Sequence, residues 1–303
     1  MSIDRSTILI GPGKIVHDGA TYFSSAPIAL TVSKTFAEIR ADSFGVVLRS
    51  LTDVSIELTA TPMEWGNHSK MNPYLGMAMG TLINGGTDKP LVVTPVNGQP
   101  LTLAAAAVMR PPGLDLSAQR PMLGAMTWTG VLANNTAWSA AGARLSHGAA
   151  ASGVALTGFD KDKTALCTWS PAYGATALPT EDGVKVDWNV QLDPVSTDSD
   201  GIVDYSFGGL EAVAKLTPLG MSAQAYLSLL AVQGAGIVRG STAAVADLVV
   251  TGGALDRVFT LKNCTPRVGN ERHGRAVKRL GELEFVATRN FADGVLSPIA
   301  VFA

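Results

Sequence analysis

Apolar and polar residues alternate with a period of two in several stretches of this chain, and that pattern is typical of half-buried β-strands. Near the C-terminus, Leu283 and Phe285 lie on one face of such a strand, and glutamates occupy the other. Residues 123–130 have the same layout, with Met126 and Trp128 at the two apolar positions. We predict that both segments are strands with one buried face.

The match between the two halves of the chain extends upstream and indicates an internal duplication. Residues 91–94 (Leu-Val-Val-Thr) recur as residues 248–251, and a Leu-Gly pair follows both copies after the same interval. Between them, Leu-Thr-Leu at 101–103 matches Phe-Thr-Leu at 259–261 with a shift of one residue. We therefore expect Trp128 and Phe285 to lie on equivalent strands.

Another alternating strand precedes these elements in each half. In the first half it covers residues 54–60 and stops at Pro62, and in the second it covers residues 186–192 and stops at Pro194. Proline lacks the N–H that a strand ladder uses, so each proline is interpreted as a strand end. We interpret these two strands as counterparts.

Each half is also predicted to contain one short helix. Residues 73–83 place apolar side chains at helical spacing, although two glycines interrupt them. The second helix is predicted at residues 222–233, with Ser222 as its N-cap and Gly234 at its end.

The N-terminal region predicts a first strand and a hairpin over residues 1–33, with turn signals at residues 11–13 (Gly-Pro-Gly) and 18–19 (Asp-Gly). Residues 34–53 then mix apolar residues with charges of both signs. Two interpretations stay open for this segment: a long hairpin that projects from the domain, and an ordinary pair of sheet strands.

The chain has 303 residues, enough for two domains of ordinary size. Small, weakly patterned residues mark 136–160 as a linker, so the expected domains are residues 1–135 and 161–303. The predicted fold class is mainly β, with two tandem β-sandwich or barrel-like domains that each carry one short α-helix. The second half also has extra residues between Pro194 and Leu248.

The composition favours extensive protein–protein contact. Hydrophobic residues make up 47% of the chain and charged residues only 16%, against about 25% charged residues in a typical soluble domain. No run of about 18 apolar residues and no secretory signal pattern is present, so no membrane anchor is expected. The net charge of −2 does not call for a nucleic-acid partner.

The motifs of catalysis are missing, so we expect a protein that is not an enzyme, with no catalytic residues, cofactor or metal. The four histidines are scattered without metal-ligand spacing, and Cys167 and Cys264 occupy non-equivalent positions, as expected of ordinary thiols. Residues 234–242 superficially resemble a phosphate loop but lack its lysine. The histidines are His17, His68, His147 and His273.

Two charged segments are candidate binding sites. Four aspartates within residues 193–204 raise the question of a calcium site, but the spacing departs from that of an EF-hand loop, so an ordinary turn is preferred. A basic cluster near the C-terminus contrasts with the acidic residues 181–211, and we interpret the two as partners in charge pairing between subunits. The residues are Asp193, Asp198, Asp200 and Asp204, and Arg267, Arg272, Arg275, Lys278 and Arg279.

The strand patterns at residues 54–62, 90–108 and 279–289 resemble those of the tail tube (major tail) proteins of long-tailed bacteriophages. The resemblance implies β-sandwich or partly closed barrel units, each with one helix, whose inner sheets join into a ring around a channel. Stacked rings would form the tube through which DNA leaves the capsid. It also implies assembly in the host cytoplasm, a final place in the virion, and contact with other tail proteins at the tube ends.

This chain departs from the simplest members of that family because it carries two units. If six units close a ring, three chains suffice, and the ring is a homotrimer with approximate six-fold symmetry. The rival arrangement is a ring of six whole chains. DNA would be only a transient, non-specific passenger.

Two other classes of function stay open. A carbohydrate-binding or adhesive β-sandwich would expose a cluster of aromatic residues, whereas the tryptophans here are dispersed along the sequence. An enzyme is disfavoured by the missing acid–base and nucleophile groups. The tryptophans are Trp65, Trp128, Trp138, Trp169 and Trp188.

Overall fold

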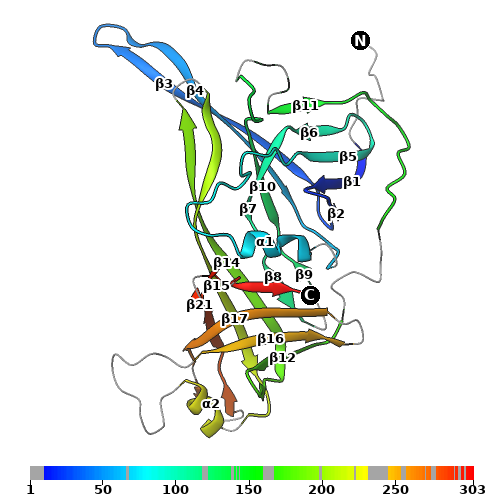
Figure 1. The fold of residues 1–303 in the computed structure, drawn as a ribbon, viewed down its shortest axis with the longest axis vertical. Coiled ribbons are helices and arrows are strands. Elements are labelled where there is room, and N and C mark those ends of the chain that lie inside the picture. Colours follow the sequence, from blue (N-terminus) through cyan, green and yellow to red (C-terminus); the bar gives the residue numbers. More distant parts are fainter. Residues whose placement is uncertain are drawn as a thin grey trace.

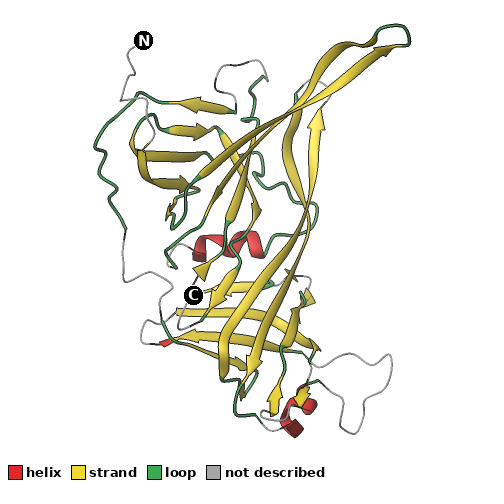
Figure 2. Cartoon of the chain, turned by 180° about the vertical axis from the view of Figure 1, so that it is seen from behind, coloured by secondary structure: helices red, strands yellow, loops and turns green. Residues whose placement is uncertain are grey.

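The computed structural model shows a mainly β protein, as the alternation of apolar and polar residues predicts. It describes residues 10–303 except 66–67, 118–121, 138–139, 141, 143, 160–166, 198–199, 222, 231–244, 254–256, 270, 274–277, 290, 293–294 and 297. Two antiparallel β assemblies lie one above the other along the long axis of the molecule, with the short helix α1 between them (Figures 1 and 2).

The first half contains a five-stranded sheet in the order β11-β6-β5-β1-β2. Asp18 and Gly19 have positive φ angles of 47° and 73° and form the turn that the Asp-Gly signal predicts. Residues 11–13 were predicted to form a turn, but they lie within β1, and a register shift between Ile10 and Gly13 absorbs them. The strands are β1 (Ile10–His17), β2 (Ala20–Phe23), β5 (Leu91–Asn97), β6 (Leu101–Leu103) and β11 (Leu145–His147).

A four-stranded sheet, in the order β3-β4-β10-β7, packs against the first and closes a sandwich. Trp128 on β10 is fully buried between them, with its ring centroid 5.8 Å from that of Tyr22 and 6.2 Å from that of His17. Edge-on aromatic contacts of this kind add to the free energy of burial. The strands are β3 (Ala29–Ala41), β4 (Gly45–Ala60), β7 (Ala105–Arg110) and β10 (Met126–Val131).

The second half is built on one ten-stranded sheet, which includes two short strands from the first half, β8 and β9. Its strand β17 serves both layers, because its first part pairs with β16 and its last part with β20. The strands are β8 (Leu114–Leu116), β9 (Met122–Leu123), β12 (Trp169–Tyr173), β13 (Thr176–Ala177), β14 (Thr180–Thr197), β15 (Gly201–Pro218), β16 (Ala246–Gly252), β17 (Arg257–Val268), β20 (Leu283–Ala287) and β23 (Ala300–Phe302).

Two small hairpins complete the strands of the described residues. β18 (Glu271–His273) pairs with β19 (Lys278–Leu280), and β21 (Phe291–Ala292) pairs with β22 (Val295–Leu296).

The two halves have the same strand-pairing pattern. The sheet β2-β1-β5-β6-β11 corresponds to β13-β12-β16-β17-β23, and β3-β4-β10-β7 corresponds to β14-β15-β20-β17. The registers agree too, because Leu91 lies opposite Leu103 as Leu248 lies opposite Leu261. Trp128 and Phe285 occupy equivalent positions, and the Phe285 ring lies 5.1 Å from that of Tyr173, as Trp128 lies beside His17.

The prediction that residues 54–60 and 186–192 are counterparts is wrong. The first segment lies in β4, the returning arm of a hairpin, and the second in β14, the outgoing arm of another. The strand also does not stop at Pro194, because β14 continues to Thr197. A proline fits there because β8 pairs with β14 only at residues 184–186, which leaves the rest of that edge without a ladder to interrupt.

The correct counterparts are the two long hairpins, β3–β4 and β14–β15, which match position by position. The two hairpins share two bulges, β14–β15 has one further register shift between Thr180 and Val184, and each turn ends in a glycine with positive φ, Gly45 at 70° and Gly201 at 65°. A side chain with a Cβ rarely adopts that conformation. The bulges place one extra residue each at Val47 and Thr52 in β4, and at Val203 and Gly208 in β15.

The helices are shorter than predicted. α1 (Asn72–Leu75) follows a 3-10 turn, η2 (His68–Met71), and ends before Gly76 instead of running to residue 83. Residues 80–83 are held by backbone hydrogen bonds to β15, so tertiary pairing overrides the helical spacing. α2 (Ala223–Leu229) lies inside the predicted helix 222–233, and Ser222 and residues 231–234 lie outside the described residues.

Part of the segment expected to be a linker belongs to the first sandwich. β11 lies within residues 136–160 and pairs with β6. Downstream, the backbone N–H of Ala151 donates to Gly98 O at 3.0 Å, and that of Val154 donates to Val96 O at 2.9 Å. The first sandwich therefore extends well beyond residue 135.

An aromatic cluster joins the two halves. Trp65 and His68 lie just before α1, and the Trp65 ring centroid lies 5.1 Å from that of Trp169 and 5.2 Å from that of Phe302. Asn72 exchanges two hydrogen bonds of 2.9 Å with the backbone of Phe302. The halves thus pack through α1 as well as through the pairing of β8 with β14.

We expect this cluster to make the protein sensitive to acid. His68 is fully buried, and burial lowers its pKa from 6.5 to about 4. The unfolded chain then binds a proton that the folded chain does not, so stability falls as the pH drops from 6.5 to about 4, by about 3 kcal/mol in total. Urea unfolding at pH 7 and pH 4.5 should show this loss, and His68→Gln should reduce it.

The exposed His147 provides a matched control, because His147→Gln should leave the pH dependence unchanged. Equal losses of stability in the parent protein and in His68→Gln would contradict the assignment to His68.

Candidate assembly interface

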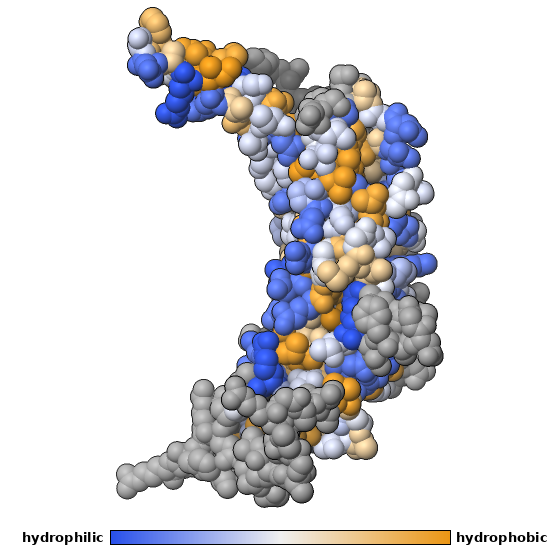
Figure 3. Space-filling view, turned by 60° about the vertical axis from the view of Figure 1, so that its left-hand side comes forward, coloured by the Kyte–Doolittle hydropathy of each residue, from blue (hydrophilic) through white to orange (hydrophobic). Residues whose placement is uncertain are grey.

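The β3–β4 hairpin projects far beyond the sandwich (Figure 1), as one of the two interpretations of residues 34–53 predicted. Along β3 only Ala41, the last residue, is even partly buried. Most of the exposed large apolar side chains in the described part of the chain lie on this hairpin (Figure 3). They are Leu30, Val32, Phe36, Ile39, Phe44, Val46, Val47, Leu48 and Leu51.

A contiguous apolar surface of this kind marks an interaction site in a soluble protein. The equivalent hairpin, β14–β15, shows how such a surface is covered. Leu51 is 44% exposed, whereas Phe207 at the equivalent position is fully buried. Leu30 is 38% exposed, whereas its counterpart Val186 is 1% exposed.

The first half of the chain covers β14–β15 at its base. β8 adds to the edge of β14, where Val186 lies opposite Leu114 and Val184 opposite Leu116. These four side chains are all buried. The strands approach so closely at Gly183 that a Cβ there would lie 2.2 Å from Leu116 O, so only glycine fits.

Residues 80–83 cover the outer part of the same hairpin. Gly80 N donates to Phe207 O at 2.8 Å, Phe207 N donates to Thr81 O at 2.9 Å, and Ile83 N donates to Tyr205 O at 2.9 Å. The Tyr74 ring meets that of Phe207 edge-on at 5.8 Å. The backbone edge and the apolar side chains of β15 therefore both find partners within the chain.

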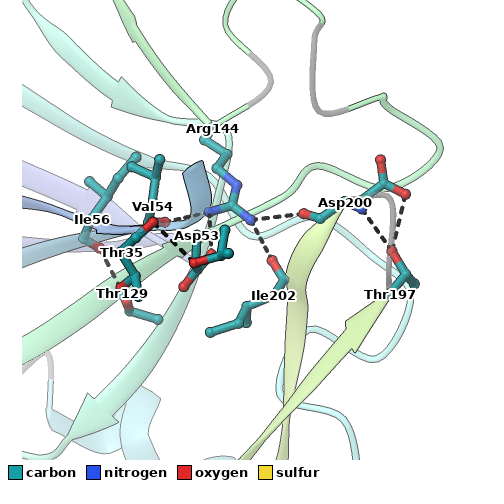
Figure 4. Close-up of polar contacts among 10 residues, drawn as sticks. Thr35, Asp53, Val54, Ile56, Thr129, Arg144, Thr197, Asp200 and Ile202 are labelled. Atoms are coloured by element: carbon teal, nitrogen blue, oxygen red, sulfur yellow. Dashed lines mark hydrogen bonds and ion pairs between the residues drawn. The ribbon is translucent and has the colours of Figure 1, made fainter. Parts of the chain in front are cut away.

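Arg144 ties the end of the covered hairpin to the middle of the exposed one (Figure 4). One guanidinium nitrogen donates to Val54 O on β4 at 2.6 Å, and the other donates to Ile202 O on β15 at 2.7 Å and to Asp200 O at 3.3 Å. Asp53 lies 3.9 Å from the guanidinium. Burial lowers the pKa of Arg144 from its ordinary value, and Asp53 opposes that shift.

A cavity of about 470 Å³ lies beside this junction, between residues 82–88, 132–137 and 200–204. Its carboxylates already have partners: Asp204 accepts hydrogen bonds from the backbone and side chain of Asn84, and Asp88 accepts one from the backbone of Asn134. Among the described residues that line it there is no histidine, cysteine, lysine or arginine. We assign it no chemistry.

The aspartates considered as possible calcium ligands do not lie together in the described part of the structure. Asp193 is exposed on β14, Asp204 is buried against Asn84, and Asp198 lies outside the described residues. Asp200 accepts a hydrogen bond from Thr197 within its turn. Among the described residues, no three His, Cys, Asp or Glu side chains gather as ligands for a metal ion.

The charge pairing predicted between subunits stays a prediction, but one member of the basic cluster forms ion pairs within the chain. Arg267 forms ion pairs with Glu211 at 3.6 Å and with Glu284 at 2.5 Å. The structure does not describe the other members of the basic cluster at side-chain level: Arg275 as a whole and the side chains of Arg272, Lys278 and Arg279 lie outside the described residues. Residues 234–242, which superficially resemble a phosphate loop, also include none of the described residues.

The cysteines and histidines do not come together. Cys167 is half-buried and Cys264 is fully buried, and both are free thiols. His17 and His68 are buried, and burial lowers the pKa of each. His147 is exposed, and the side chain of His273 is outside the described residues.

The sequence does carry a signal for the equivalence of the two hairpins, although the apolar periodicity does not reveal it. Asp-Ser-Phe-Gly at 42–45 recurs as Asp-Ser-Asp-Gly at 198–201, and each is followed by an aliphatic residue and a valine. Because the flanking strands differ at most positions, only the turn shows the relation.

Comparisons with known proteins add no family assignment: no protein-family model matches the chain, and no curated protein sequence matches it. Within the described residues, no helix is long and apolar enough to span a membrane.

Replacing Arg144 should loosen the junction of the two hairpins. Arg144→Ala removes a buried cation from three backbone carbonyls, and we expect a loss of about 2–4 kcal/mol in the free energy of unfolding. Arg144→Lys should recover only part of it, because one ammonium cannot span both strands. Urea denaturation of the purified variants measures both losses.

Arg49 on the exposed hairpin is the matched control. It pairs with Glu38 at 3.0 Å in solvent, so Arg49→Ala should cost less than about 1 kcal/mol. Similar losses for Arg144→Ala and Arg49→Ala would show that Arg144 does not hold the junction.

Proposed function

We propose that this chain is a structural subunit that polymerises through its β3–β4 hairpin into stacked rings, and that these rings form the tail tube of a phage. One observation carries the proposal: the exposed β3–β4 hairpin has a counterpart, β14–β15, that is covered inside the same chain by β8 at its base and by residues 80–83 along β15. The resemblance of the strand patterns to tail tube proteins supplies the biological setting.

The covered hairpin supplies the physical argument for assembly. An unpaired strand edge that carries apolar side chains is prone to pair with another chain. β8 covers this edge of β14 at residues 184–186, whereas β3 lies at the end of its sheet, with no further strand beside it among the described residues. Repeating the internal contact between copies would cover the base of every β3–β4 hairpin and continue the sheets around a closed ring.

The matching pairing patterns support an internal duplication and, with it, a count of three chains per ring. Two sandwiches in each chain give six equivalent positions from three chains, with contacts within and between chains alternating. The two sandwiches already adjoin directly through the pairing of β8 with β14. In this proposal DNA passes through the ring without specific binding, and other tail proteins contact the tube ends.

The alternative, a carbohydrate-binding or adhesive sandwich, has less support. Such a module binds sugars on exposed aromatic rings, but Trp65, Trp128, Trp169 and Trp188 are each less than 10% exposed. Phe159 is exposed but packs edge-on against Phe23 at 5.5 Å, and the other exposed aromatic residues of the described part, Phe36 and Phe44, lie on the projecting hairpin among aliphatic side chains. That setting fits a protein contact better than a sugar platform.

The number of chains per ring tests the proposed architecture. We expect three chains per ring, because each chain supplies two of the six positions. Cryo-electron microscopy of the assembled protein, or native mass spectrometry of rings released from it, counts them. A ring of six whole chains would contradict the trimer, and a protein that stays monomeric at all concentrations would contradict assembly.

Shortening the exposed hairpin should stop assembly without unfolding the subunit. Residues 38–49 would be replaced by Asn-Gly, which joins Ala37 to its partner Ser50 through a two-residue turn. Circular dichroism and thermal unfolding should match the parent, while sedimentation and negative-stain microscopy should show no rings or tubes.

The equivalent change in the covered hairpin is the matched control. Replacing residues 194–205 by Asn-Gly joins Asp193 to Ser206 and removes contacts within the chain. It should lower the unfolding temperature markedly. Normal tubes after the first deletion would rule out the exposed hairpin as the assembly element.

A further inference from the structure

Each of the two strands that pair inside the chain, β8 and β14, has a counterpart in the other half, but those counterparts do not pair with each other. The hairpin β8–β9 sets Leu114 opposite Leu123, and the hairpin β18–β19 sets Glu271 opposite Leu280. Leu123 and Leu280 are the leucines of the repeated Leu-Gly pairs. The hairpin β18–β19 is therefore the second-half counterpart of β8–β9.

These two hairpins differ in what they pair with. β8 adds to β14, so β8–β9 belongs to a ten-stranded sheet. β18–β19 forms a two-stranded sheet by itself within the described part of the chain. An isolated two-stranded ribbon is marginally stable in water, so β18–β19 lacks the support that its counterpart has.

The counterpart of β14 lacks a neighbour in the same way, because β3 ends its sheet where β14 continues into β8. The unpaired ribbon β18–β19 and the unpaired edge of β3 therefore correspond to β8–β9 and β14, which pair with each other inside the chain. We infer that β18 of one copy adds antiparallel to β3 of a second copy, in the register that β8 makes with β14. This inference rests on the proposed self-assembly and names its partner strands.

The register follows from the positions of the bulges and turns. Val184, Lys185 and Val186 correspond to Ile28, Ala29 and Leu30, because both hairpins have the same bulges and the same closing glycine. On the other strand, Leu114, Asp115 and Leu116 correspond to Glu271, Arg272 and His273. Within the chain, Lys185 lies opposite Asp115. Between copies, Ala29 then lies opposite Arg272, with Leu30 opposite Glu271 and Ile28 opposite His273.

Two features fit a contact that forms between subunits after each has folded. The ladder ends where Pro27 precedes Ile28, since proline has no N–H to donate, and β18 ends at the matching residue, His273. The buried leucines of β8 are replaced by Glu271 and His273, so the join between copies is more polar than the join inside the chain. Interfaces between subunits that first fold alone are commonly more polar than a domain core.

Disulfide trapping tests the register. Residues directly opposite on antiparallel strands have Cα atoms about 4.5–5.5 Å apart, within the range that a disulfide spans. In a Cys167→Ser background, with the buried Cys264 retained, Ala29→Cys is combined with Arg272→Cys. Mild oxidation of the assembled protein should give a ladder of covalent multimers on a non-reducing gel, and reductant should collapse it to monomer.

Three controls frame the result. Lys185→Cys with Asp115→Cys makes the equivalent pair inside one chain and should give an intramolecular disulfide with no ladder. Thr31→Cys with Arg272→Cys displaces the pair by two residues and should cross-link at least tenfold less. Each single variant should give no ladder.

The outcomes separate this inference from the proposed function. Rings or tubes that form normally, with no ladder from Ala29→Cys and Arg272→Cys while the internal pair cross-links, would overturn the register and leave assembly standing. A stronger ladder from the displaced pair would overturn it too. A protein that neither assembles nor cross-links between copies would overturn both proposals.

Discussion

The structure depends on how the free edge of a long β-hairpin is satisfied. An extended strand presents a row of N–H and C=O groups along its outer edge, and apolar side chains on its faces add surface that water disfavours. β14–β15 meets these needs in part within the chain: β8 pairs with β14 at residues 184–186, and residues 80–83 pair with β15 farther along. β3–β4 has the same geometry but keeps its edge and its apolar side chains in solvent.

The contrast between the two hairpins connects the fold with the proposed assembly. Equivalent positions carry apolar residues in both hairpins, such as Leu51 and Phe207, but only the second is buried. In the proposed assembly, the contact that stabilises the chain internally would also be the template for the contact that joins copies. Such a template explains why an exposed apolar ribbon is compatible with a specific partner and need not lead to disordered aggregation.

The cores of the two sandwiches show how far the sequences of the two halves differ while the strand pairing is the same. Trp128 packs against His17, and Phe285 packs against Tyr173, at equivalent positions. The larger Trp128 ring is paired with the smaller His17 ring, and the smaller Phe285 ring is paired with the larger Tyr173 ring. Compensating changes of size of this kind keep the interior filled. Strand pairing is a backbone property and tolerates such exchanges, which is why the turns and bulges preserve the relation better than the side chains do.

The sequence by itself determined the local features of this protein. Period-two alternation identified the strands at 123–130 and 280–289, the Asp-Gly pair located the turn at 18–19, and the repeated Leu-Gly interval aligned Trp128 with Phe285. These follow from interactions between residues close together in the chain. The tertiary structure alone decided which arm of each hairpin corresponds to which, because alternation is the same in both arms. It also ended the first helix at Leu75, since residues 80–83 pair with a strand more than a hundred residues away. Sequence patterns identified residues 34–53 as mixed in character, but whether their apolar side chains are covered depends on distant strands, and burial is a property of the whole fold.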